Sequence, residues 1–313
     1  MDEGVESEWV PLRIRTSRQL FDEILKLAKK YLNFVSIDQA VDMINGTTPI
    51  IPNSCVITFD DGQLNNFTIA LPILRKHGIP ATFYPTTLVL NKGTPYWFDR
   101  LDYAIQQPGL DKQIVRVGDM EILIDQSSRE ALADSLSKLI RSLKKKDQSD
   151  EEFHNEVSDI CDTFEQISGH SIHDLAPGDP WSAPMSWSDI IKCAKSDDVA
   201  VGGHTVSHIR LPFASDSVIR EELQDSKIAL EKEMGLSCDH FCYPNGDWDN
   251  HTIELVMEAG YKSAVTTDEG SNKVGDDLFS LKRYTFPTSD GALKGLFAVT
   301  GVLHAMSSRK IYE

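Results

Sequence analysis

Residues 56–62, with the sequence VITFDDG, place two adjacent carboxylates at the end of an apolar segment. Residues 56–59 favour a β-strand, and Asp60, Asp61 and Gly62 follow directly. Asp and Gly are common where a strand turns, so a plain turn is one interpretation. The other is a functional site at the carboxyl end of a buried strand, where α/β folds place their chemistry. Because neighbouring carboxylates repel each other unless a cation or a proton lies between them, this second interpretation requires metal ligands elsewhere in the chain.

Strand-like and helix-like segments alternate around this motif. Helical patterns at residues 17–32 and 36–47 precede it, and a helix at 65–79 and a strand at 81–86 follow it. This alternation predicts an α/β fold with a parallel sheet. Helix-forming and charged residues dominate from about 127 to 183, which we interpret as a helical insertion. We therefore expect residues 1–313 to form a single α/β barrel domain that carries this insertion.

Charge and cysteine content narrow the class of partner. The 31 Lys and Arg residues against 48 Asp and Glu residues give a net charge of −17, which argues against nucleic acid or an anionic membrane as the main partner. No run of 18 apolar residues predicts a membrane span, and the acidic N-terminal segment lacks the apolar core of a secretory signal. The five cysteines lack CxxC spacing, so we expect free thiols in a reducing, cytoplasmic compartment.

A histidine pair offers the metal ligands that the two carboxylates require. His204 and His208 follow a short apolar strand and two glycines in VAVGGHTVSHIRL. Residues at i and i+4 lie on one face of a helical turn and can bind one metal ion. Such a pair also arises by chance, but this one follows a strand, as Asp60 and Asp61 do. Two histidines and one carboxylate, with open positions for water, have the composition of a hydrolytic metal site, and zinc is the expected ion.

A third strand end reads HFCYPNGDWD, residues 240–249. PNG signals a turn, and a tight turn also directs backbone N–H groups outward, where they could stabilise an oxyanion. Together the three segments resemble the polysaccharide deacetylase family, a carbohydrate esterase family 4-like group that shares the NodB homology domain. TFDDG is similar to its first motif, HTVSH has the His-Ser/Thr-x-x-His form of the second, and FCYPNG resembles the third. The likeness covers most of residues 17–290, in a pattern similar to members associated with bacterial surface-polysaccharide biosynthesis.

The resemblance implies a distorted (β/α) barrel that carries one divalent metal ion at its carboxyl face. Asp61, His204 and His208 would bind the metal, and Asp60 would be the catalytic base. The backbone N–H of Asn245 would help to hold the oxyanion.

Several positions depart from the family pattern. Cys242 occupies the third-motif position that usually carries an arginine, and Arg283, after a later strand, is the candidate to supply that charge to Asp60. The late Leu-His motif, whose histidine is the general acid, has its counterpart in VLH, which ends at His304. Because the surrounding pattern is that of a plain helix, we expect His304 to lie away from the metal. Asp268 only loosely matches the fourth motif.

These residues predict a metal-dependent hydrolase that removes the acetyl group from an N-acetylated sugar in a saccharide or polysaccharide precursor. A related amide hydrolase acting on a small non-sugar compound is the alternative among enzymes. A carbohydrate-binding protein that has lost turnover is the alternative from another class. Asp60 favours an enzyme, because a binding module has no need of a base once the metal is held.

Overall fold

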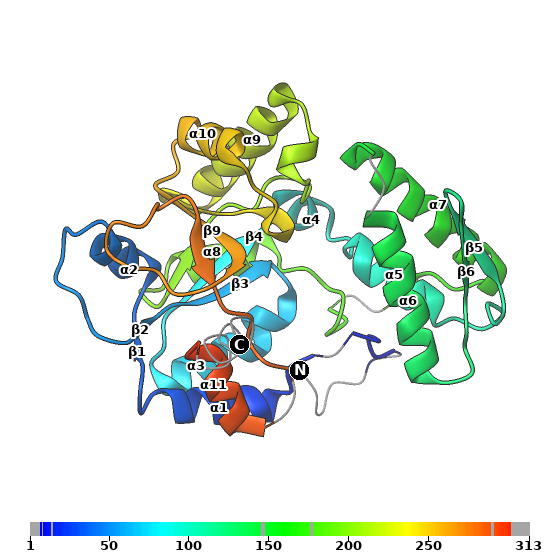
Figure 1. The fold of residues 1–313 in the computed structure, drawn as a ribbon, viewed down its shortest axis with the longest axis horizontal. Helices are drawn as coiled ribbons and strands as arrows, with labels where there is room; N and C mark the ends of the chain where they lie inside the picture. The colour runs from blue at the N-terminus through cyan, green and yellow to red at the C-terminus, as the bar shows by residue number, and fades with distance from the viewer. Residues whose placement is uncertain are drawn as a thin grey trace, which may run out of the picture. The chain divides into compact units, whose positions relative to one another are not determined.

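The computed structural model describes residues 7, 9–13, 15–144, 148–175, 178–288 and 291–301 (Figure 1). These residues form two compact units. The first unit contains residues 15–92, 185–288 and 291–301, and the second contains the described parts of segments 5–14 and 93–184.

Parallel strands form the centre of the first unit. β3 (Ile57–Asp61) pairs with β4 (Ala81–Pro85), which pairs with β7 (Val199–Val201). β8 (His240–Cys242) pairs with β9 (Ser263–Glu269), which pairs with β10 (Leu281–Arg283). A parallel bridge between Gly203 and Phe241 joins the two sets. The strand order is therefore β3-β4-β7-β8-β9-β10, and the predicted parallel α/β sheet is confirmed.

The six strands form an arc, and the side chain of Arg283 joins its two end strands, β3 and β10. No backbone ladder connects β10 to β3 among the described strands, so they form an open arc and not a closed barrel. Arg283 on β10 instead reaches Thr58 and Asp60 on β3. A short parallel pair, β1 (Asn33–Phe34) with β2 (Ser54–Cys55), precedes β3 along the chain.

Helices connect the strands and supply the apolar groups that cover the outer face of the arc. Ser17 and Ser36 cap the first two helices through their side chains, which accept backbone N–H groups of the first turn. Outward-facing strand residues such as Phe83, Val201 and Phe241 join the helices in one core. The helical elements of this unit are α1 (Arg18–Ala28), α2 (Ile37–Ile44), η1 (Asn66–Ala70), α3 (Leu71–His77), α4 (Thr87–Lys92), α8 (Trp187–Ala194), η3 (Leu211–Phe213), α9 (Asp216–Met234), η4 (Pro244–Gly246), α10 (Asn250–Glu258) and α11 (Gly291–Val299).

The inner face of the arc is partly polar. Successive strand residues point to opposite faces, so the neighbours of core residues point inward. Tyr84, Cys242, Val265 and Leu281 form a small inner cluster of their own, against which α2 packs. The polar side chains of Asp60 and Arg283 also meet on this face. The sheet thus separates an apolar outer core from an inner site that holds charge.

The second unit is built mainly from helices. It contains α5 (Trp97–Ile105), α6 (Arg129–Lys144), α7 (Asp150–Ser168), η2 (Ile172–Asp174) and the antiparallel strands β5 (Ile114–Val117) and β6 (Met120–Leu123). α6 buries one face, which carries Leu132, Leu136, Leu139 and Leu143 at helical spacing. The helical segment expected at 127–183 makes up the larger part of this unit. The long segment of this unit begins earlier than expected, at Gly93, because α5 packs into the same core.

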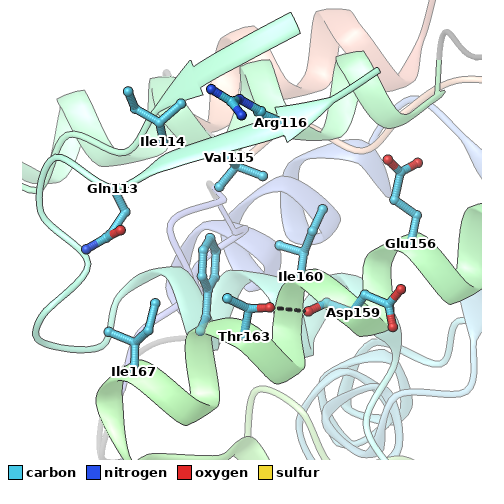
Figure 2. A pocket seen from close by; sticks show the side chains of 10 residues that line it. Gln113, Ile114, Val115, Arg116, Glu156, Asp159, Ile160, Thr163 and Ile167 are labelled. Carbon is cyan, nitrogen blue, oxygen red and sulfur yellow. Dashed lines mark hydrogen bonds between the residues drawn. The ribbon is translucent and has the colours of Figure 1, made fainter. Parts of the chain in front are cut away.

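A surface pocket of the second unit lies between β5 and α7 (Figure 2). Val115, Ile160 and Phe164 supply apolar lining, and Arg116 and Glu156 supply charge. The residues expected to bind metal or to react belong to the first unit, so this pocket contains none of them. None of the described helices combines the length and the apolar content needed to cross a bilayer.

The close approach of strands at Gly202 yields a first prediction. A Cβ at Gly202 would lie 2.4 Å from the Tyr84 ring and 2.5 Å from the backbone oxygen of His240. Gly202→Ala should therefore lower the free energy of unfolding by about 1–3 kcal/mol, since overpacking forces strands or rings apart. Urea denaturation followed by tryptophan fluorescence measures the change. An unaltered unfolding midpoint would contradict the close packing of β4 against β7 and β8.

Candidate active site

The two carboxylates stand where β3 turns. Asp61 adopts a left-handed backbone conformation with φ of 71°, and Gly62 follows with φ of 79°. The carbonyl oxygen of Gly62 accepts the N–H of Met185, which fixes the turn. The turn and the functional site are therefore not exclusive interpretations of this segment. The turn lets the two side chains, which follow one another in sequence, face different partners.

The segment that carries the two histidines is an irregular loop, and the expected helical turn is wrong. Thr205 and His208 have left-handed φ angles of 64° and 66°. The N–H of His208 donates to the Oγ1 of Thr205 at 2.9 Å, and not to a helical carbonyl. The local hydroxyl competes with helical hydrogen bonding, which is the physical reason for the difference. The loop nevertheless brings both imidazoles to one point.

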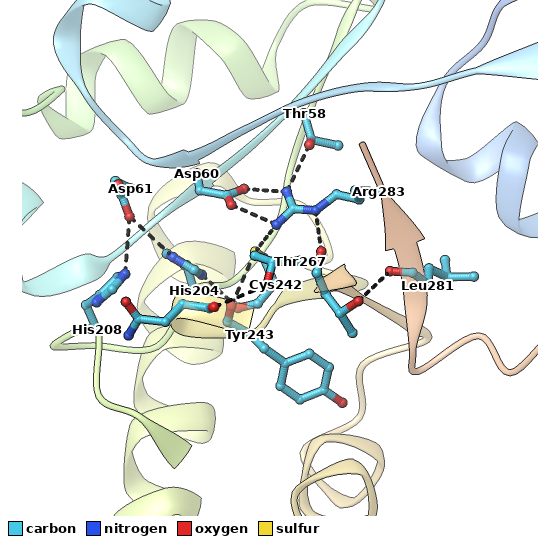
Figure 3. A network of polar contacts seen from close by, with 12 residues as sticks. Thr58, Asp60, Asp61, His204, His208, Cys242, Tyr243, Thr267, Leu281 and Arg283 are labelled. Atoms are coloured by element: carbon cyan, nitrogen blue, oxygen red, sulfur yellow. Dashed lines mark hydrogen bonds and ion pairs between the residues drawn. The ribbon is translucent and has the colours of Figure 1, made fainter. Parts of the chain in front are cut away.

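Asp61, His204 and His208 form a candidate metal site (Figure 3). The Nε2 atoms of His204 and His208 lie 3.4 and 3.3 Å from Oδ1 of Asp61. The three potential ligand atoms all lie within 4.8 Å of one another. The Nδ1 of His204 is 2.7 Å from the carbonyl oxygen of Cys242, which orients the ring as the outer partners of metal ligands do. Two imidazole nitrogens and one carboxylate oxygen thus fit a divalent ion such as zinc.

The ionisation of Asp61 suits this arrangement. Burial by itself would raise the pKa of the Asp61 carboxyl, but hydrogen bonds from His204 and His208 hold that pKa well below its usual range. Asp61 is therefore a carboxylate at neutral pH, as a metal ligand must be.

Asp60 faces away from the histidines toward Arg283. Nη1 and Nη2 of Arg283 each lie 2.8 Å from one carboxylate oxygen of Asp60, so the pair is bidentate. Burial would raise the pKa of Asp60, but the charge and hydrogen bonds of Arg283 lower it. The sequence names Arg283 as the residue that could replace the missing third-motif arginine, and the structure brings it to Asp60.

All five donors of the Arg283 guanidinium have partners. Besides the two bonds to Asp60, Nε donates to the carbonyl oxygen of Thr266 at 2.7 Å and Nη1 donates to Thr58 at 3.0 Å. Nη2 lies 3.3 Å from Sγ of Cys242. An arginine carries five N–H donors in a fixed plane, so this complete set holds the Asp60 carboxylate in one orientation.

Cys242 has a small, neutral side chain that contacts Arg283. All five cysteines are free, and Cys242 is fully buried. Burial and the neighbouring Asp60 charge raise the pKa of the Cys242 thiol, which keeps it protonated at neutral pH. A small neutral side chain on β8 leaves room for the guanidinium that arrives from β10.

The third strand end places Asn245 in a left-handed turn with φ of 57°. Its carbonyl oxygen accepts from the hydroxyl of Thr267 at 3.2 Å. A Cβ at Gly246 would meet that same hydroxyl at 1.9 Å, so the turn requires glycine there. Because proline fixes φ near −65°, it cannot occupy position 245 without rebuilding the turn.

Two sequence candidates remain, His304 and Asp268. His304 lies outside the residues that the structure describes. Asp268 on β9 accepts the indole N–H of Trp248 at 3.1 Å. Sequence reasoning also missed Glu222 of α9. Its carboxylate accepts backbone N–H groups of the histidine loop, residues 204–208. No sequence signal marks it, because the neighbouring Glu221 has the same chemistry and points to solvent.

Comparison with known proteins identifies the family of this chain. A sequence model of the polysaccharide deacetylase family matches residues 49–264, and the chain belongs to that family. YxkH from Bacillus subtilis (strain 168), which carries the name of the same family, is 24% identical over 85 residues. That match covers 27% of this chain and 30% of YxkH.

Solved structures support the fold. The Streptococcus pyogenes deacetylase PplD in complex with acetate is similar with a TM-score of 0.59 and 18% identity, over 92% of this chain and 88% of that one. IcaB from Ammonifex degensii gives a TM-score of 0.54 and 18% identity, over 90% and 88%. The expected α/β fold of the NodB type is thereby confirmed.

The candidate metal site yields a second prediction. His204→Ala and His208→Ala should each abolish stoichiometric zinc binding, because the loss of one of three protein ligands leaves too few to hold the ion. Metal content after dialysis, measured by elemental analysis, checks this. His251→Ala is the matched control, because His251 is exposed and pairs with Asp216. Full zinc content in both single variants would contradict the assignment.

The Asp60–Arg283 pair yields a third prediction. Arg283→Met should lower the free energy of unfolding by about 1–3 kcal/mol, since it strips the Asp60 carboxylate of charged hydrogen-bond donors. This is less than the cost of breaking a fully buried pair, because the Asp60 and Arg283 side chains are 31% and 18% exposed. Urea denaturation gives the value.

The double variant Cys242→Arg/Arg283→Met tests the link between the two strands. An arginine on β8 can fill the space that the Arg283 side chain vacates, so part of the lost stability should return. Equal stability of parent and Arg283→Met would show that the ion pair contributes nothing.

Proposed function

We propose that this chain is a metal-dependent deacetylase that hydrolyses the N-acetyl group of an amino sugar in a saccharide or polysaccharide precursor. The proposal rests on one observation, that the two adjacent carboxylates have different partners. Asp61 faces His204 and His208, while Asp60 is held by Arg283 and is not among the candidate ligands. A purely structural or binding role for the metal would need Asp61 but not Asp60.

The residues support hydrolysis in the following way. A divalent ion held by Asp61, His204 and His208, with zinc as the proposed ion, would supply Lewis-acid activation of water and of the amide carbonyl. Asp60, ionised because Arg283 lowers its pKa, accepts a proton from the attacking water as general base. Arg283 keeps that carboxylate oriented. The backbone N–H of Asn245 is the proposed donor to the oxyanion.

Family membership and charge support the substrate class. The match to the polysaccharide deacetylase family covers residues 49–264, which include all three motifs. PplD, one of the similar structures, holds acetate, which is the acid released by deacetylation. The net charge of −17 suits a neutral or cationic saccharide better than an acidic one. We place the substrate among the N-acetylated saccharides of surface-polysaccharide biosynthesis.

Acetate release from a panel of substrates tests the proposal. Zinc-loaded protein and chelator-treated protein are each incubated with N-acetylated amino-sugar oligomers and with small non-sugar N-acetyl amides. Metal-dependent acetate release from the oligomers supports the proposal. Acetate release from the small amides alone favours the alternative enzyme, an amide hydrolase that acts on a small non-sugar compound. Saccharide binding without any release favours a carbohydrate-binding protein that has lost turnover.

A fourth prediction concerns Asp60 itself. Asp60→Asn should retain zinc and fold while losing about 100- to 10,000-fold in turnover, because an amide cannot accept the proton that a carboxylate accepts. Acetate release and zinc content are measured on the same samples. Asp197→Asn makes the same chemical change on an exposed side chain and should behave as the parent does. Near-parental turnover of Asp60→Asn would place the base elsewhere.

A further inference from the structure

The loop at residues 204–208 combines one internal hydrogen bond, from the N–H of His208 to the Oγ1 of Thr205, with an unfavourable backbone conformation. Thr205 and His208 both have left-handed φ angles, 64° and 66°. A positive φ is a marked departure for a β-branched residue such as threonine. Backbone of this kind persists only where surrounding groups over-determine it, and such segments concentrate at functional sites. The groups that hold this loop therefore bear directly on where the two imidazoles stand.

One carboxylate on α9 holds the middle of the loop. Oε2 of Glu222 accepts the backbone N–H groups of Val206 at 2.8 Å and Ser207 at 2.9 Å. Oε1 of Glu222 accepts the hydroxyl of Ser207 at 2.6 Å. Both oxygens of the carboxylate thus bind the loop between the two histidines. Bonds to an ionised acceptor are the stronger kind of hydrogen bond.

The opposite side of the loop is held by α4. The N–H of Leu88 donates to the carbonyl oxygen of Val206 at 2.8 Å, and the N–H of Thr87 donates to that of Thr205 at 3.4 Å. Glu222 binds the N–H groups of the same short segment from the other direction. The loop is therefore fixed between two helices, and Glu222 is the side chain that supplies the acceptor.

We propose that Glu222 is a positioning residue of the metal site, which sets metal affinity by holding His204 and His208 at Asp61. The inference rests on the proposed function, since it concerns the same metal. Glu222 acts through the backbone of the loop and does not itself belong to the candidate ligand set. Removal of its carboxylate lets the loop relax away from the left-handed conformation and spreads the imidazoles over several positions. Loss of such outer partners typically costs about 10- to 100-fold in metal affinity.

Three substitutions at Glu222 separate positioning from charge. Glu222→Ala removes both acceptors. Glu222→Asp keeps the charge but shortens the side chain by one methylene group, so that it no longer reaches the loop. Glu222→Gln removes the charge but keeps an amide oxygen for the two N–H groups, and its amide N–H can donate to the Ser207 hydroxyl. The neighbouring Glu221→Ala, on the exposed side of α9, is the matched control.

Zinc affinity of the metal-free proteins is measured by competition with a chromogenic chelator, and the Co(II)-loaded proteins are compared by their visible absorption. We expect about 10- to 100-fold weaker zinc binding for Glu222→Ala and Glu222→Asp, with an altered cobalt spectrum. Glu222→Gln should restore affinity to near that of the parent, and Glu221→Ala should match the parent in both measurements. Circular dichroism of each metal-free variant shows whether it is folded.

The outcomes distinguish this inference from the proposed function. Parental zinc affinity and cobalt spectrum in Glu222→Ala would overturn the positioning role while leaving the metal site intact. If Glu222→Ala does not fold, equal affinities of the Asp and Gln variants would overturn it as well. A parent protein that binds neither zinc nor cobalt would instead refute the proposed function, before any variant is compared.

Discussion

Two adjacent carboxylates can both stay ionised in this site only because each one faces its own set of positive or hydrogen-bond-donating partners. Asp60 meets the guanidinium of Arg283, and Asp61 meets His204 and His208. The left-handed backbone at Asp61 makes this separation possible at the end of β3. Without those partners, repulsion and burial would raise the pKa of at least one carboxyl.

Small residues on other strands of the arc leave space for the side chains around the two carboxylates. Gly202, which follows β7, leaves space for the Tyr84 ring, because a Cβ at position 202 would lie 2.4 Å from that ring. Cys242 on β8 is small enough to admit the guanidinium from β10, and its backbone oxygen orients His204. The Arg283 guanidinium reaches Asp60 from β10 because a long side chain can extend across the inner face from one strand to another. The Arg283 side chain also spans the opening between β10 and β3, so that one group serves both the fold and the candidate base.

Much of the local structure could be predicted from the sequence, because the signals are short-range. Serine caps, helical periodicity and the carboxylate pair after an apolar strand each depend on a few neighbouring residues. The structure places the histidine pair beside Asp61, but on a left-handed loop in place of the expected helical turn. Hydrogen bonds with α4 and α9 hold that loop. Residues 93–126 carried no pattern that joins them to the later helices. They belong to the second unit because α5 buries its apolar face in the same core.

The sequence by itself determined the parallel α/β class, the family motifs and the identity of the candidate ligands. Each of these signals depends on residues that lie close together in the chain. Only the tertiary structure decided that Arg283 reaches Asp60, since 223 positions separate the two residues in the chain and their contact depends on the strand order. It also decided that Glu222, and not Glu221, holds the histidine loop. The two glutamates are chemically identical neighbours, and the direction in which each side chain leaves α9 is set by the packing of that helix on the sheet.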